Sequence, residues 1–183
     1  MIKKLCFAII AMGMAALVNA QEVKLGVKVG VNISTLNGNE DNLDAQDGWV
    51  LGATAEVALT EKFSLQPELL YSQQGAQDRE SFLYDLKYIT MPIMAKYYLA
   101  EGFSLEAGPQ LSILVKDEIL SKTSDATLNP NSENLDIAVN LGLGYQLNKR
   151  FSVQTRYSIG TMDVDKEAKF KNGVLQLTVG YHF

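Results

Sequence analysis

Apolar and polar residues alternate along most of this chain with a period of two. From Val23 to Ile33 every odd position is apolar, whereas the even positions between them carry lysine, glycine or asparagine. Successive side chains of a β-strand point to opposite faces, so the pattern predicts a strand with one apolar and one polar face. The same alternation recurs in seven further segments, which are 49–59, 63–72, 89–99, 103–115, 135–147, 151–160 and 175–183.

The connections between these eight segments alternate in length. Three are short, at 60–62, 100–102 and 148–150, and each precedes a similar motif that begins at Phe63, Phe103 or Phe151. In an up-and-down meander all short connections lie at one end and all long ones at the other. Short periplasmic turns with longer extracellular loops are typical of outer-membrane barrels. The four long connections are 35–48, 75–86, 117–134 and 162–172.

Two kinds of barrel fit an alternating pattern, because the apolar face can lie inside, as in a soluble lipocalin, or outside against lipid. The odd face carries bulky Leu, Ile, Val, Phe and Tyr, which exceed the narrow interior of an eight-stranded barrel. The chain also ends in an alternating strand with a terminal Phe183. The sequence therefore predicts an all-β fold, an eight-stranded antiparallel up-and-down transmembrane β-barrel. The mean hydropathy of zero resembles that of a soluble domain only because averaging hides the period of two.

The first twenty residues have the layout of a secretory signal peptide. Lys3 and Lys4 precede a short apolar stretch, and Val18-Asn19-Ala20 matches a small-residue cleavage site. The alternative is a buried N-terminal helix. Cleavage would assign 1–20 to the signal and 21–183 to one barrel domain exported to the outer membrane of a Gram-negative cell.

Cleavage would also leave a mature chain with little metal or redox chemistry. It removes Cys6, the single cysteine, and changes the formal net charge from −5 to −7. Disulfides, thiolate metal sites and a cysteine nucleophile are then excluded, and an acidic chain is a poor binder of nucleic acid. The single histidine, His182, is expected at the periplasmic end, where a Ser–His–acid triad is poorly placed. We predict no cofactor, no metal and no catalytic residues.

The polar face gathers charged residues inside the predicted barrel. Buried charges need partners, so we predict a structural network of ion pairs that fills the lumen. The alternatives are a narrow ion path or gate, and an acid–base couple of Glu56 and Glu68. By parity Lys116 also belongs to this face. The network is predicted to contain Lys24, Lys28, Glu56, Glu68, Lys96, Glu106, Asp136 and Arg156.

Three prolines fall inside predicted strands, namely Pro67, Pro92 and Pro109. Proline lacks the N–H that a β-ladder needs and is usually confined to edges or bulges. Because a closed barrel has no edge, we predict bulges or local loss of pairing at these positions.

Several motifs resemble those of a known family. Residues 63–75 and 88–99, together with 26–32 and the final Tyr-His-Phe, are similar to the small outer-membrane β-barrel proteins labelled porin-family or PorT-like. The resemblance covers 21–183 and implies a fold and a location but no reaction. The last strand also resembles the signal recognised by the outer-membrane assembly machinery, which would involve Tyr181 and Phe183. Outer-membrane lipids and that machinery are the implied partners.

The long connections carry most of the negative charge, with net charges of −4, −2, −3 and 0 in chain order. Residues 40–48, or Asp163, Asp165 and Glu167, could hold Ca²⁺, but neither has the spacing of an EF-hand loop, so solvated loops are favoured. We therefore predict a monomeric scaffold that displays acidic loops to an extracellular ligand or envelope protein. The alternatives are a narrow porin-like channel for small solutes and an outer-membrane enzyme that modifies lipid.

Overall fold

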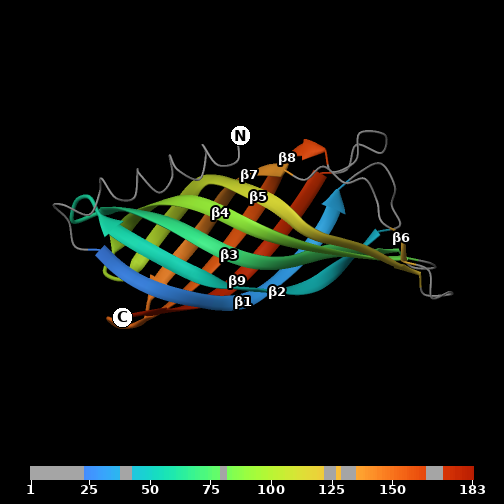
Figure 1. The fold of residues 1–183 in the computed structure, drawn as a ribbon. Helices are drawn as coiled ribbons and strands as arrows, with labels where there is room; N and C mark the ends of the chain where they lie inside the picture. Colours follow the sequence, from blue (N-terminus) through green and yellow to red (C-terminus); the bar gives the residue numbers. More distant parts are fainter. Residues whose placement is uncertain (1–22, 38–42, 79–81, 122–126, 129–134, 164–170) are drawn as a thin grey trace, which may run out of the picture.

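Eight antiparallel strands close into a barrel (Figure 1). The structure, a computed structural model, describes residues 23–37, 43–78, 82–121, 127–128, 135–163 and 171–183. None of these residues forms a helix long and apolar enough to cross a membrane. The predicted signal peptide 1–20 lies outside the described residues. The strands are β1 (Val23–Asn37), β2 (Leu43–Ala58), β3 (Phe63–Asp78), β4 (Phe82–Ala100), β5 (Phe103–Ser121), β6 (Thr127–Leu128), β7 (Leu135–Gln146), β8 (Phe151–Asp163) and β9 (Lys171–His182).

Each strand pairs with its neighbour in the sequence, and β1 pairs with β9 to complete the circle. The two-residue β6 is the exception, since it adds only to the outer part of β5, and β5 pairs directly with β7. The barrel is therefore the predicted eight-stranded meander. Strand β6 was not predicted and lies within the connection 117–134.

The apolar face is outside, as predicted. Among the described residues, every large hydrophobic side chain that is strongly exposed stands at an odd position, for example Leu25 at 57% and Leu177 at 51%. Even positions are buried and mostly polar, including Lys28, Glu68 and Arg156. This distribution is the inverse of a soluble barrel and provides a belt that lipid can cover.

The three short connections lie at one end of the barrel, together with the C-terminus (Figure 1). We call this the short-turn end. Asn148 stabilises one turn there, because its Oδ1 accepts hydrogen bonds from the backbone N–H groups of Arg150 and Phe151 at 2.9 and 3.0 Å. Another turn needs Gly102, whose φ of 77° is in the left-handed region.

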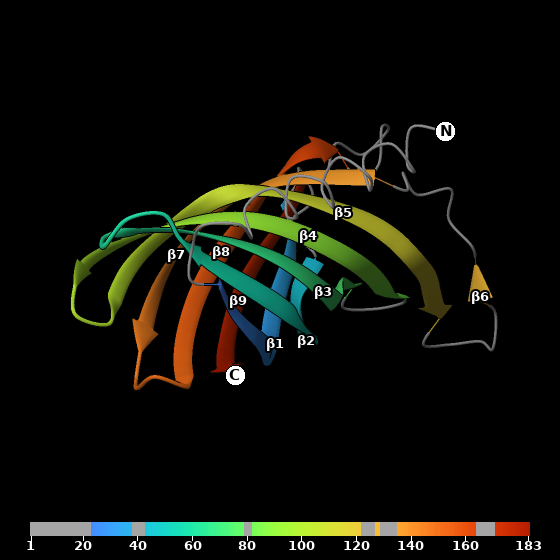
Figure 2. The same ribbon diagram turned by 60° about the vertical axis from the view of Figure 1, so that its left-hand side comes forward.

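The opposite end differs from the prediction in the length of its strands. Strands β4 and β5 have 19 residues each, whereas about 9–11 residues suffice to cross a membrane. The predicted connection 75–86 is largely a continuation of the β3–β4 ladder, with Gln77 still paired to Leu83. Figure 1 shows β2 to β5 reaching past the ends of the other strands, and the projecting ends of β4 and β5 are also visible in Figure 2. The polar composition of these extensions concealed their strand structure.

The prolines interrupt the ladders without shifting them. Pairing between β3 and β4 stops after Pro67–Ile93 and resumes at Leu70–Thr90 in the same register. Likewise, no pairing joins β4 to β5 between Pro92–Gln110 and Ala95–Ala107. The predicted loss of pairing is confirmed beside Pro67 and Pro92. Pro109 lies in the second gap on the β4 side, but it pairs with Val139 in an uninterrupted β5–β7 ladder, so the prediction holds there on one side only. The register shifts of the sheet lie elsewhere, for example between Lys87 and Tyr88.

Candidate functional site

The lumen gathers the ionisable side chains of the barrel and is the candidate site. Long side chains enter it from strands all around the barrel, among them Lys28 of β1, Glu68 of β3 and Arg156 of β8. At Gly144 of β7, an added Cβ would lie 2.4 Å from Oε1 of Glu106 and 2.6 Å from Oγ of Ser104, both on the neighbouring strand β5. The missing side chain of this glycine thus leaves the space that Glu106 occupies.

Glu68 is the centre of the charged network. Its side chain is fully buried and accepts hydrogen bonds from Nζ of Lys28 and Nε2 of Gln66, at 2.9 and 2.7 Å. The guanidinium of Arg156 donates one bond of 2.9 Å to each carboxylate oxygen. Such a bidentate pair has the strongest geometry available to a carboxylate. One carboxylate therefore joins β1, β3 and β8 across the lumen.

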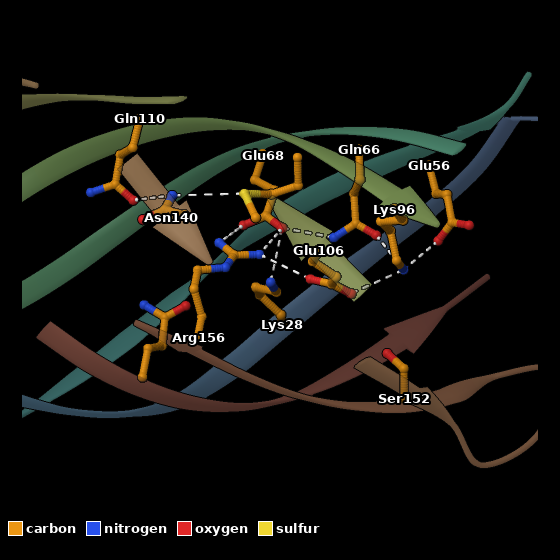
Figure 3. A network of polar contacts seen from close by, with 12 residues as sticks. Lys28, Glu56, Gln66, Glu68, Lys96, Glu106, Gln110, Asn140, Ser152 and Arg156 are labelled. Carbon is orange, nitrogen blue, oxygen red and sulfur yellow. Dashed lines mark hydrogen bonds and ion pairs between the residues drawn. The ribbon is translucent and has the colours of Figure 1, made fainter. Parts of the chain in front are cut away.

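The contacts continue into a closed ring (Figure 3). Arg156 approaches Glu106 at 3.5 Å, and Glu106 approaches Lys96 at 3.6 Å. Lys96 then donates to Oε1 of Gln66 at 3.1 Å, which returns the path to Glu68. We call these residues, with Lys28 and Glu56, the lumen ring. Its three cations and three carboxylates balance in charge, as buried charges require.

Glu56 is the member of the lumen ring that lines the opening of the barrel at the short-turn end. It accepts a 2.9 Å bond from Lys96 and a 2.6 Å bond from the hydroxyl of Tyr98. Nζ of Lys96 also lies 5.6 Å from the centre of the Tyr98 ring, within the range of a cation–π contact. Beside them Oγ of Ser152 lies 3.2 Å from Nε2 of His182. His182 lies at the short-turn end, the end that the sequence predicts to face the periplasm.

Neutral amides form the next layer away from the mouth. Asn140 donates to Oε1 of Gln110 at 3.1 Å and accepts a short bond from Ser158. Asn32 donates to Oγ of Ser72 at 2.9 Å and accepts from Gln176 at 3.1 Å. These bonds tie β1 to β3 and β9, and β7 to β5 and β8, so they fasten the walls without adding charge.

An apolar cluster lies on the β4–β5 wall toward the end of the barrel that carries the long connections. Leu86, Tyr88 and Leu114 are at most 9% exposed and form this cluster. Met94 and Leu70 are also buried, closer to the amides. Polar side chains share this depth, since Gln74 pairs with Leu86 and Ser72 with Tyr88 on the neighbouring strand.

The structure brings six of the eight predicted network residues together in the lumen ring and leaves two apart. Lys24 is exposed at the mouth and makes no ion pair with any described residue. Asp136 is buried near the other end, but no cation in the described part of the chain contacts it. An even position in the sequence predicts that a side chain faces the lumen, but not where it lies along the barrel axis. Lys24 and Asp136 lie too far along that axis from the lumen ring to join it.

Lys116 also differs from the prediction, because it is exposed. The register shift between Lys87 and Tyr88 places an additional residue in β5, since Tyr88 pairs with Leu114 and Lys87 with Lys116. A bulge of this kind reverses the alternation of sides. Parity beyond the bulge therefore assigns the wrong face.

Sequence reasoning missed the neutral members of the network. Gln66 links Lys96 to Glu68, and Asn32 and Asn140 each bridge two walls. Their even positions were visible in the sequence, but only charged residues were selected. A rule that any polar residue on the lumen face needs partners would have found them.

Comparison with known proteins gives the class of this molecule. The family model "Outer membrane protein beta-barrel domain" matches residues 5–183. Among solved structures, Ail of Yersinia pestis is 17% identical with a TM-score of 0.59, over 88% of this chain and 99% of that one. Neisserial surface protein A is 13% identical with a TM-score of 0.64, over the same shares. No protein with a curated description matches the sequence.

The inverted barrel with its polar, filled lumen is thus that of an integral outer-membrane β-barrel protein. The chain belongs to the outer membrane protein β-barrel domain family, as its sequence motifs indicated. The short-turn end accordingly faces the periplasm, and the long-loop end faces the cell exterior. Tyr181 and Phe183 lie on the outer face of the periplasmic end, packed edge to face at 5.6 Å. Their role in assembly stays a prediction.

The position of the lipid belt leads to a prediction about outward-facing leucines. We expect Leu141→Arg, in the middle of β7, to lower the free energy of unfolding by about 2–4 kcal/mol, because an arginine there would lie in hydrocarbon. Leu147→Arg, at the membrane boundary, should cost about 0–1 kcal/mol. Both leucines are more than half exposed. Urea unfolding in lipid vesicles measures the two costs, and equal costs would contradict this placement of the belt.

Proposed function

We propose that this protein is a closed structural and interaction scaffold of the outer membrane, rather than a pore. The observation that supports this is the buried lumen ring, which spans the barrel from β3 to β8. A solute would have to break buried ion pairs to pass it. The cost of separating buried charges opposes such a path.

The scaffold proposal makes the extracellular end the part that interacts. Strands β2 to β5 extend well past the length that a membrane requires, and they carry connections rich in Asp and Glu. One solved structure of Ail is a complex with the heparin analogue sucrose octasulfate, a polyanion. The acidic connections of this chain would repel such a ligand. We propose instead an extracellular ligand or envelope protein with a basic surface.

Conductance tests the closed lumen. We expect purified protein in planar lipid bilayers to show no unitary current steps, because no open path passes the lumen ring. The refolded sample should first show the gel mobility difference between heated and unheated protein that marks a folded barrel. A reproducible unit conductance that scales with salt concentration would overturn the scaffold proposal.

One observation favours a narrow channel as the second candidate. Several buried polar atoms in the lumen have no hydrogen-bond partner within the described residues, including Oε1 of Gln154, Oε1 of Gln176 and Oδ1 of Asp136. Such atoms are commonly satisfied by internal water. A chain of water would carry small ions past the ring, and the same recordings decide between the two candidates.

The third hypothesis, a lipid-modifying enzyme, has less support. Ser152 contacts His182, but Nδ1 of His182 has no hydrogen-bond partner among the described residues. A serine–histidine pair needs a group on that nitrogen to orient the base. We therefore do not propose catalysis.

A further inference from the structure

Three neighbouring seams of the barrel, a seam being the ladder between two adjacent strands, each have a gap of two backbone pairs. In the β2–β3 seam the pairs stop at Thr54–Glu68 and resume at Val57–Leu65 in the same register. The gap in the β3–β4 seam follows it along β3, and the gap in the β4–β5 seam follows along β4. Proline has no N–H to donate to a ladder. Each gap contains one proline, in turn Pro67, Pro92 and Pro109.

The opposite wall of the barrel is continuous. The β1–β2, β1–β9, β5–β7 and β7–β8 ladders run from their first to their last described pair without a missing position. The β8–β9 ladder is likewise continuous from Phe151–Tyr181 to Ile159–Gly173. Lipid offers no hydrogen bond to replace a missing backbone pair. Strands β3 and β4, which have gaps on both sides, are therefore the part of the wall that is held least firmly.

The lumen ring is attached at these gaps. Glu56 and Gln66 are opposite each other in the β2–β3 gap, and Glu68 is in the β3–β4 gap. Glu68 in turn binds Lys28 of β1 and Arg156 of β8, which belong to the continuous seams. Its ion pairs therefore join the weakly paired strands to the firmly paired ones across the lumen. Side-chain contacts here replace part of the backbone attachment that the prolines remove.

Met94 closes the lumen side of the β4–β5 gap. Its side chain is fully buried, and its Sδ accepts a weak hydrogen bond of 3.7 Å from Nδ2 of Asn140. A thioether is a poor acceptor and a methionine side chain is flexible, so this contact constrains β4 little. Ile93, the residue before it, is 36% exposed on the lipid-facing side. At this gap lipid and lumen are thus separated by two strands that are not paired with each other.

We propose that β3 and β4 form a lateral gate between the lumen and the membrane, and that the lumen ring is the latch that holds it shut. The ion pairs of Glu68 with Lys28 and Arg156 draw β3 toward the opposite wall. When they are lost, β4 separates from β5 at their shared gap, where the fewest backbone pairs have to break. The opening leads sideways into hydrocarbon, so the molecule that it admits is apolar, such as the acyl chain of a lipid.

Amide hydrogen exchange of the barrel in phosphatidylcholine vesicles tests the latch. Glu68→Gln keeps the size of the side chain but removes its charge. In this variant we expect the amides of Leu69, Ile93 and Met94 to exchange at least about tenfold faster than in the wild type, since local opening becomes easier. The amide of Thr178, in the continuous β9, should keep its wild-type rate. Equal acceleration in both walls would mean general loosening of the barrel and would overturn the gate, as would unchanged rates in β3 and β4.

Lys24→Gln is the matched control for the exchange measurement, because it removes a charge that is exposed and outside the lumen ring. It should leave all these rates unchanged, and acceleration in β3 and β4 would contradict the specific role of the ring. Gel mobility before and after heating shows whether each variant folds. If Glu68→Gln does not, Lys28→Gln removes one cation of the latch and should give the same pattern with a smaller amplitude.

The substitution Met94→Cys reports the direction of the opening. The background is Cys6→Ser, which removes the single cysteine of the chain. With Glu68→Gln present, we expect Met94→Cys to react with pyrenyl maleimide dissolved in the vesicle membrane. Thr178→Cys, at a buried position of the continuous wall, should stay unreactive. A disulfonated maleimide added to the water should label neither. Labelling of Met94→Cys by the charged reagent alone would show an opening along the barrel axis and refute the lateral gate, as would labelling by neither reagent.

Discussion

Replacing Glu68 with alanine is expected to lower the thermal stability of the barrel more than removal of any other carboxylate in the lumen. The substitution leaves Lys28 and Arg156 buried, at most 2% exposed in their side chains, without their main counter-charge. Breaking a buried ion pair by removing one partner costs about 3–5 kcal/mol, since an uncompensated charge stays in the interior. Here one carboxylate serves two cations and Gln66, so the cost should lie at the upper end.

The measurement is the temperature at which the unheated, faster-migrating gel band is lost in a detergent of neutral charge. Lys24→Gln is the matched control, because it removes a charge from the same face at a position that is exposed and outside the lumen ring. It should leave the transition unchanged. If Glu68→Ala unfolds at the wild-type temperature, the ring does not stabilise the barrel, and the scaffold proposal loses its main structural support.

The comparison of Glu68 with Lys24 also shows how far the sequence predicts the site. Both residues have even positions, and both were assigned to the lumen face. Glu68 is buried in the lumen, whereas Lys24 is exposed at the mouth of the barrel. Alternation contains no information on depth, however, because depth depends on strand tilt and on which strands are neighbours across the lumen. The contact of Glu68 with Arg156 joins residues 88 positions apart, and no local pattern predicts it.

The fold was predicted more fully than the site because a membrane barrel imposes its rules locally. Each strand must alternate, and each short turn must lie at the periplasmic end, so eight segments suffice to define the meander. The alternation is lost where the strands extend beyond the membrane, because no lipid contact there requires one face to be apolar. Gln77 and Leu83 are paired beyond the apolar belt, where polar residues are allowed on both faces, and they were assigned to a loop.

The alternation of apolar and polar residues also does not explain why several positions on the lumen face are glycine. Even positions of β1 and β9 carry Gly26, Gly30 and Gly180, and small residues were expected there only because the interior is narrow. The structure adds a distinction between them. A Cβ added at some of these glycines would meet only side-chain atoms at close range, whereas at others it would meet the backbone of the next strand.

Gly30→Ala is therefore expected to impair the barrel severely. A Cβ on Gly30 would lie 2.0 Å from the carbonyl oxygen of Leu177 and 2.7 Å from Cα of Thr178, so the β1–β9 backbones would have to separate. These two strands close the barrel, and their ladder runs through this position, where Gly30 pairs with Thr178. Overpacking that forces backbone shifts costs about 1–3 kcal/mol, and the short contacts here place the cost at the upper end of that range. The folded fraction after refolding into vesicles, measured by the mobility shift, should fall several-fold.

Gly180→Ala provides the matched control for Gly30→Ala, because the same methyl group is added to the same pair of strands and the same face. Its Cβ would meet Oγ of Ser152 at 2.6 Å, and the next backbone atom is 3.8 Å away, so rotation of one hydroxyl relieves the contact. We expect near-normal folding of this variant. Similar folding of both variants would mean that the strands adjust freely at the closure of the barrel.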